Sequence, residues 1–205
     1  ASDVYKRQTY TCLIDDDDVR EAIIKSEYNA DVLPSNTQLA GAPIELVSVP
    51  RREMRLRTVL APVVPLYDYI FIDCSPSLGY TTVNILTAAD TVLIPVQCEY
   101  LALEGLSKLL NTIRKVKSGL NPALDIEGFL LTMYMRNRLN NQVVNEVREH
   151  FGQLAYDTII QRNIRLGEAP SHGKPVMLYD AGAVGSENYL TLAREFLKRN
   201  RKRSK

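Results

Sequence analysis

The sequence predicts an α/β fold with a mostly parallel β-sheet and helices on both faces. Three observations support this prediction. Short apolar runs typical of strands recur along the chain, amphipathic helical patterns separate them, and turn-forming residues close them. Strands that alternate with helices form βαβ units, which build parallel sheets. A chain of 205 residues is long enough for one such domain.

The apolar run at residues 69–72 is the strongest strand candidate. Its β-branched and aromatic side chains are typical of a strand buried on both faces. The run stops at Asp73, and a carboxylate at the carboxyl end of a parallel strand lies where open α/β sheets bind ligands. Alternatively, Asp73 caps the helix that follows. The local pattern alone leaves both interpretations open.

The remaining elements follow in order along the chain. A helix is predicted after the acidic run at residues 15–18, whose charges suit a helix N-terminus. Further strands are predicted at residues 30–34, 91–96, 128–133 and 155–160. Further helices are predicted at residues 51–60, 81–89, 101–116, 141–151 and 188–197. Their periodic apolar positions predict which face of each helix is buried.

Composition limits the functional classes. The net charge is +1, so any affinity for nucleic acid must come from local clusters of basic residues. The three cysteines are sparse, which argues against a disulfide framework or a zinc site and favours a reducing cytoplasm. No apolar run approaches the ~20 residues of a membrane span. Residues 1–8 show no periodicity, so we expect a mid-domain start or a non-native leader there.

Four stretches from Leu33 onward resemble the ParA/Soj family of chromosome- and plasmid-partitioning ATPases, which belong to the deviant Walker P-loop class. The stretches are LPSNTQLAGAPIELV, YDYIFIDCSPSLG, NILTAADTVLIPVQCEYLALEGLSKLLNTI and RNIRLGEAPSHGKPV. The resemblance implies a P-loop NTPase-like fold and a single ATPase domain over residues 1–205. The family's first strand and P-loop would be missing from it.

The resemblance also implies a mechanism. Family members bind ATP with Mg²⁺, form a homodimer in the ATP-bound state and bind DNA without sequence preference. A ParB-type partner protein then stimulates hydrolysis, and the dimer releases the DNA. The implied location is cytoplasmic and nucleoid-associated, without a membrane partner.

The resemblance assigns the nucleotide site residue by residue. Asp73 is the Walker B carboxylate, which is catalytic and acts on Mg²⁺ through a water molecule. Residues 74–79, which include Pro76, form the loop that senses the γ-phosphate. Arg162 and Asn163 match the family segment near the adenine, where an amide side chain can both donate and accept. A turn residue after a strand is the alternative interpretation of Asn163.

DNA contacts are implied at two places. Arg165 matches a family arginine associated with DNA binding, and Arg136 or Arg138 matches a second one. The basic tail at residues 198–205 begins with Lys198 and Arg199, and such clusters give salt-sensitive affinity that is independent of sequence. Alternatively, the tail is only solvated and frayed.

The chain contains no G-x-x-x-x-G-K-[ST] motif, whose backbone and lysine hold phosphates. We therefore expect this polypeptide to bind ATP weakly or not at all and to be inactive by itself. Two alternative functions remain: a MinD-like membrane-associated positioning ATPase, and a catalytically inactive DNA-binding scaffold of the same fold. A relative that holds an iron–sulfur cluster would need Cys74 or Cys98 at an interface, and buried strand ends suit these cysteines better.

Overall fold

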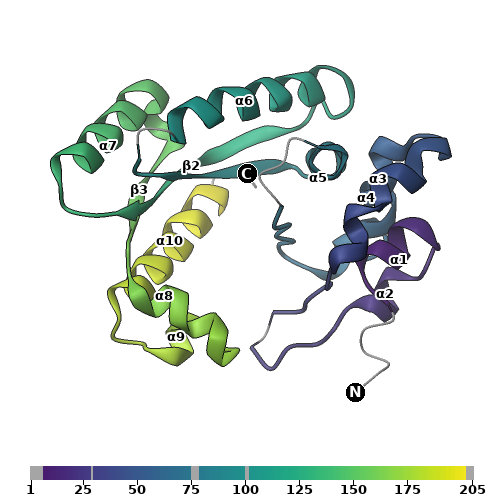
Figure 1. Cartoon of the computed structure of the whole chain (residues 1–205), viewed down its shortest axis with the longest axis horizontal. Helices are drawn as coiled ribbons and strands as arrows, with labels where there is room; N and C mark the ends of the chain where they lie inside the picture. The colour runs from purple at the N-terminus through teal and green to yellow at the C-terminus, as the bar shows by residue number, and fades with distance from the viewer. Residues whose placement is uncertain (1–6, 29, 75–78, 100–101, 202–205) are drawn as a thin grey trace. The chain divides into compact units, whose positions relative to one another are not determined.

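The computed structural model describes residues 7–28, 30–74, 79–99 and 102–201. The chain forms two compact units, one of residues 1–90 and 111–124 and the other of residues 91–110 and 125–205. Figure 1 shows the chain from its N-terminus in purple to its C-terminus in yellow. Each unit has its own helices and its own buried apolar clusters.

The second unit is built on a parallel sheet. Its strands are β1 (Thr91–Gln97), β2 (Asp125–Tyr134) and β3 (Ala155–Gln161), in that order across the sheet. In the register of the first pair, Ile94 lies beside Phe129. All three strands were predicted within a few residues of these bounds.

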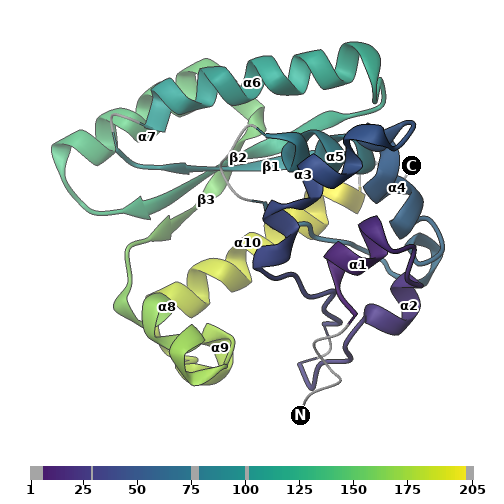
Figure 2. The ribbon, with the colours of Figure 1, turned by 45° about the vertical axis from the view of Figure 1, so that its right-hand side comes forward.

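Helices cover both faces of this sheet. The first half of α6 (Ala102–Gly119) and all of α7 (Arg138–Phe151) lie on one face, and α10 (Val184–Arg201) lies on the other, as Figures 1 and 2 show. The predicted parallel α/β architecture is therefore confirmed. The three helices are longer than the predicted segments because polar residues extend them beyond their apolar stripes.

The core of the second unit is centred on β2, the middle strand of the sheet. Residues 127–131 of β2 are all buried, because this strand has a neighbour on each side and helices on both faces. On the α10 side, Leu130 packs with Tyr156 and Ile160. On the other side, the ring of Phe129 stacks on that of Phe151, with 3.8 Å between the ring centroids.

Capping residues at Asn137 and Gly152 set the two ends of helix α7. The side chain of Asn137 accepts a hydrogen bond from the backbone N–H of Asn140 (2.8 Å), which starts the helix earlier than the apolar pattern indicated. Gly152 ends the helix with a φ of 53°. Val143, Val144 and Val147 are buried, as their spacing predicted.

Short helices follow β3 in the second unit. They are α8 (Ile164–Glu168), η6 (Ala169–His172) and α9 (Val176–Tyr179). One more short helix, η5 (Gly152–Leu154), precedes β3. None of them was predicted, because each is too short to show a helical apolar stripe. Their ends are set instead by local caps.

The described residues of the first unit are mainly helical. Its elements are α1 (Thr9–Ile14), α2 (Val19–Ala22), η1 (Thr37–Ala40), α3 (Ala42–Glu45), η2 (Leu46–Ser48), η3 (Arg52–Met54), α4 (Arg55–Leu60), η4 (Val64–Leu66) and α5 (Tyr80–Ala88). One cluster buries Cys12, Val19, Ala22 and Val63. The acidic run acts as a cap, since the Asp18 side chain accepts from the backbone N–H of Arg20.

Gln8 is the first buried residue in the described part of the chain. This side chain is buried, and its amide donates to the side chain of Gln38 (3.1 Å). The backbone N–H of Gln8 donates to the hydroxyl of Thr11 at the start of α1 (3.2 Å). Gln8 is therefore packed into the first unit, and the expectation for residues 1–8 stays a prediction.

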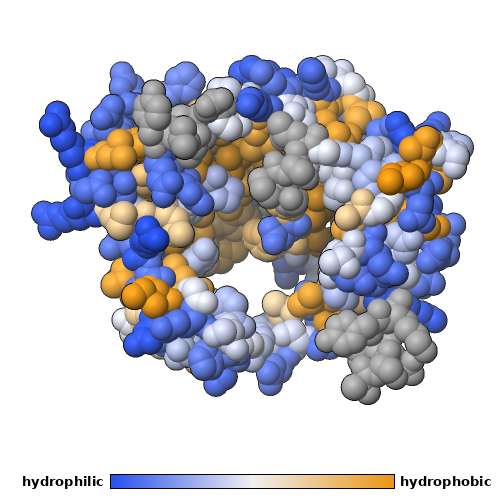
Figure 3. Space-filling model, viewed as in Figure 1, coloured by the Kyte–Doolittle hydropathy of each residue, from blue (hydrophilic) through white to orange (hydrophobic). Residues whose placement is uncertain are grey.

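Two predicted strands are absent from the described sheet. At residues 30–34, only Val32 pairs, in an isolated antiparallel bridge with Ile24. Residues 69–72 form no strand, and Phe71 is 73% exposed. An apolar run becomes a buried strand only beside other strands, and these residues belong to the first unit, whereas the three strands belong to the second. Apolar surface residues are visible as orange patches in Figure 3.

Candidate functional site

The carboxyl ends of the three strands are tied together in the second unit. The backbone N–H of Cys98, just after β1, donates to the carbonyl of Thr132 in β2 (2.9 Å). The N–H of Arg162, just after β3, donates to the carbonyl of Tyr134 (2.9 Å). The segments that leave the three strands therefore meet at one edge of the sheet, where parallel α/β sheets bind ligands.

Asn140, in the first turn of α7, bonds to two of these segments. Its buried side chain donates to the carbonyl of Cys98 (2.8 Å) and accepts from the N–H of Met135 (2.6 Å). Met133, at the end of β2, has a left-handed backbone with a φ of 55°. This conformation is uncommon for a residue with a side chain and turns the chain sharply as the strand ends.

Asp73 belongs to the first unit, whereas the strand ends described above belong to the second. Its carboxylate is exposed and follows Ile72, which packs against the cluster of Leu13, Leu56 and Ile85. An exposed carboxylate offers the oxygen ligands that Mg²⁺ prefers. Pro76 and most of the predicted phosphate-sensing loop lie outside the described residues.

Cys98 in the second unit and Cys74 in the first differ in burial. Cys98 is fully buried, as predicted, and burial raises the pKa of its thiol to about 11. Cys74 is exposed, so its predicted burial was wrong. Partial loss of hydration and the neighbouring Asp73 carboxylate raise the pKa of the Cys74 thiol. Both thiols are therefore protonated at neutral pH in the metal-free chain.

Asn163 acts as a helix cap. Its side-chain oxygen accepts a hydrogen bond from the backbone N–H of Arg165 (2.9 Å) at the start of α8. The local role is thus the one expected of a turn residue after a strand. The predicted adenine contact of Arg162 and Asn163 stays a prediction. The side chain of Arg162 is exposed at the strand end.

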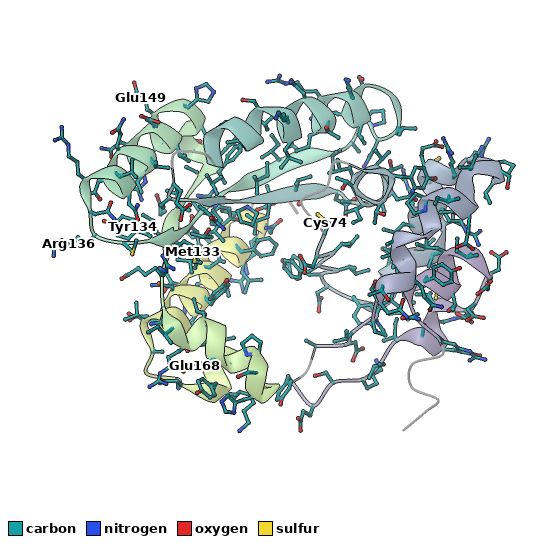
Figure 4. All side chains as sticks on the ribbon, viewed as in Figure 1. Cys74, Met133, Tyr134, Arg136, Glu149 and Glu168 are labelled. Carbon is teal, nitrogen blue, oxygen red and sulfur yellow. The ribbon has the colours of Figure 1, made fainter. Side chains whose placement is uncertain are left out.

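Arg165 lies between two carboxylates. Its guanidinium is 2.7 Å from Glu168 and 3.2 Å from Asp180, and the hydroxyl of Tyr179 also donates to Glu168 (3.2 Å). The hydrogen bond from Arg165 lowers the pKa of the Glu168 carboxyl. Figure 4 labels Glu168 among the short helices α8 and α9. A DNA phosphate would have to compete with these carboxylates for Arg165.

Arg136 and Arg138 lie at the turn between β2 and α7. Both are exposed, and Figure 4 shows Arg136 pointing outward from this turn. Such cations are available to a phosphate backbone. Both arginines are therefore placed equally well for the second predicted DNA contact.

Lys198 and Arg199 are adjacent on α10 but differ in environment. Lys198 is exposed, whereas the Arg199 side chain is 23% exposed and bonded to Glu195. Sequence reasoning missed Arg194, which lines the same surface as Lys198 and Arg201 of the predicted basic tail. Its position four residues before Lys198, which places both side chains on one helix face, was the signal that would have found it.

Sequence comparison identifies close relatives. The family described as "AAA domain" matches residues 1–126. The chain is 56% identical over 188 residues to the sporulation initiation inhibitor protein Soj of Bacillus subtilis, which covers 91% of this chain and 74% of that protein. It is 50% identical over 197 residues to the chromosome partitioning protein ParA of Myxococcus xanthus, which covers 95% of this chain and 70% of that protein.

Solved structures show the same fold. A putative plasmid partition protein from Borrelia burgdorferi, bound to AMPPNP, matches with a TM-score of 0.80 and 26% identity over 96% of this chain and 76% of that chain. A cobyrinic acid a,c-diamide synthase from Mycobacterium smegmatis, with a bound ATP analogue and magnesium, matches with a TM-score of 0.72 and 34% identity. That match covers 78% of this chain and 66% of the synthase.

The fold and these matches define an α/β ATPase domain of the P-loop type. The chain belongs to the ParA/Soj family of partitioning ATPases. It spans about three quarters of the curated relatives and about two thirds of the synthase. The relatives do not favour the MinD-like alternative, and none of the described helices is both long and apolar enough to cross a bilayer.

Proposed function

We propose that this chain is the larger part of a partitioning ATPase that segregates chromosome or plasmid DNA. The observation that carries the proposal is the 56% identity to Soj over 91% of the chain. In this proposal, residues 1–205 contribute to a single ATPase domain, which forms a homodimer when ATP is bound. A ParB-type protein is its partner, and the protein associates with the nucleoid.

ATP and Mg²⁺ are the cofactors of the proposed activity. Two of the matching solved structures contain an ATP analogue, and one of these also contains magnesium. The exposed Asp73 carboxylate fits a Mg²⁺ contact through water, and Arg162 and Asn163 would face the adenine. When bound, Mg²⁺ offsets the charge of the β- and γ-phosphates. Asp73 would hold the ion by accepting hydrogen bonds from its bound water.

DNA binding is proposed at exposed cations of the second unit. Arg136, Arg138 and Lys198 are exposed, and Arg165 is half exposed between its carboxylates. Phosphate contacts of this kind carry no sequence information, so they suit a protein that binds DNA anywhere. The affinity should therefore depend on salt and not on base sequence.

The test measures binding of this chain to two duplexes of equal length and unrelated sequence by fluorescence anisotropy. We expect equal affinities that fall roughly a hundredfold between about 50 and 200 mM salt, as for about four phosphate contacts. Lys198→Ala should weaken both equally, whereas Lys25→Ala, which removes a lysine paired with Asp31 in the first unit, should weaken neither. No binding at low salt, or a strong preference for one duplex, would contradict the proposal.

A further inference from the structure

The last two turns of α10 carry two different sets of side chains. Arg194, Lys198 and Arg201 are exposed, and together with Leu197 they line one hollow of about 410 Å³. Here we call these three cations the α10 basic stripe. Over seven residues, the stripe spans roughly 10 Å along the helix axis. The opposite side of the same turns faces β2 and β3.

Arg199 holds this opposite side against the sheet. Its Nε and Nη2 donate to Glu195 (3.0 and 2.6 Å), and its Nη1 and Nη2 donate to the carbonyls of Gln153 and Ala155 (3.1 and 2.8 Å). Its guanidinium carbon also lies 3.9 Å from the centroid of the Tyr156 ring. All three nitrogen atoms of Arg199 are therefore already engaged, so few donors remain for a phosphate.

Tyr156 connects Arg199 to a buried carboxylate. Tyr156 is fully buried, and its hydroxyl donates to Glu127 at the start of β2 (3.0 Å). Glu127 is 2% exposed and also accepts from the side-chain amide of Asn200 (3.1 Å). The final turn of α10 is thus bonded to the amino ends of both β2 and β3.

Glu195 completes this anchor one turn earlier. Its carboxylate accepts from the backbone N–H groups of Asp157 and Thr158 (2.9 Å each) and from the Thr158 hydroxyl (2.6 Å). Burial alone would raise the pKa of Glu195, but these hydrogen bonds and the one from Arg199 together lower it. Glu195 is therefore ionised at neutral pH and available to Arg199.

We infer that α10 is a DNA-phosphate-binding helix whose ligands are Arg194, Lys198 and Arg201. In this assignment, Arg199 and Tyr156 are positioning residues that hold the α10 basic stripe rigid on the sheet. The inference rests on the proposed DNA binding, and it gives Arg199 a positioning role in place of the phosphate contact expected from the sequence. Pre-ordered cations lose less conformational freedom on binding than cations on a frayed helix end, so loosening the anchor should weaken DNA binding.

The decisive variant is Arg199→Lys, which keeps the positive charge at position 199 but removes the planar guanidinium. Lysine can still contact a phosphate as a point charge, but it does not replace a guanidinium that makes four hydrogen bonds and stacks on a ring. We therefore expect Arg199→Lys to weaken binding to duplex DNA threefold or more and to speed hydrogen exchange in the last two turns of α10. Arg57→Lys, at an exposed position of α4, is the matched control and should change neither.

Tyr156→Phe provides a second test that alters no charge and keeps the ring. It should also weaken DNA binding and speed exchange in α10, and it remains informative if Arg199→Lys does not fold. If Lys198→Ala weakens binding but Arg199→Lys and Tyr156→Phe bind as the unaltered chain does, the positioning role is wrong and the proposed function stands. If Arg199→Ala weakens binding without faster exchange in α10, Arg199 is a direct ligand and the inference fails. If the unaltered chain shows no salt-sensitive DNA binding, both proposals fail.

Discussion

Gly128 in β2 lies tightly against Leu154 and Tyr156. A Cβ atom at this position would stand 2.6 Å from the carbonyl oxygen of Leu154 and 2.7 Å from the ring of Tyr156. That ring is fully buried and bonded to Glu127, so it has little room to move. We expect Gly128→Ala to lower the free energy of unfolding by about 3 kcal/mol, the upper part of the range for overpacking. Urea unfolding measures this change.

Gly105 in α6 is the matched control for that substitution. A Cβ atom there would meet no atom within 4 Å. Alanine is a better helix former than glycine, so Gly105→Ala should raise the free energy of unfolding by roughly 0.5–1 kcal/mol. Equal effects of the two substitutions would show that close packing at Gly128 is not what requires glycine.

Among the elements, α7 is coupled to the ends of two strands through one buried amide. Asn140→Ala would leave the carbonyl of Cys98 and the N–H of Met135 without this partner. We expect a loss of about 1–3 kcal/mol in the free energy of unfolding. The neighbouring Asn141 is exposed and bonds the hydroxyl of Tyr134, so Asn141→Ala should change stability by no more than about 0.5 kcal/mol. Thermal unfolding of both variants tests the difference, and a stable Asn140→Ala variant would refute it.

The same elements show what the sequence can predict. The spacing of Val143, Val144 and Val147 was enough to find α7 and its buried face, because a helix stripe depends on nearby residues only. The start of α7 needed the cap at Asn137, which periodicity does not report. The anchoring role of Arg199 was not predictable, because the carbonyls of Gln153 and Ala155, to which it donates, lie more than forty residues away in sequence; only its pairing with Glu195 is local.

At the scale of the whole molecule, the apolar run at residues 69–72 was the largest error. A strand buried on both faces and an exposed apolar segment have the same local sequence, since only the neighbours differ. The run lies in the first unit, and the described sheet lies in the second. The parallel sheet itself was predictable because its strands and helices alternate along the chain.

Acid should destabilise both units. Hydrogen bonds from Arg20 and Lys25 lower the pKa of Asp18 and of Asp31 in the first unit. In the second unit, the pKa of Glu195 is lowered, as described above. A carboxyl group whose pKa is lower in the folded chain stabilises it above the unfolded pKa, about 4 for Asp and Glu. That contribution disappears as the pH falls through the folded pKa, so Tm should fall below about pH 4.

Glu195→Gln separates the buried contribution from the exposed pairs. The variant lacks the carboxylate, so its Tm should be lower than that of the unaltered chain at neutral pH and should approach it as the pH falls below about 4. Salt screens exposed pairs such as that of Asp18 and Arg20 far more than a mostly buried one. The difference between the two proteins should therefore persist in high salt at neutral pH. A difference in Tm that does not change with pH would show that the charge of Glu195 contributes nothing to holding α10 on the sheet.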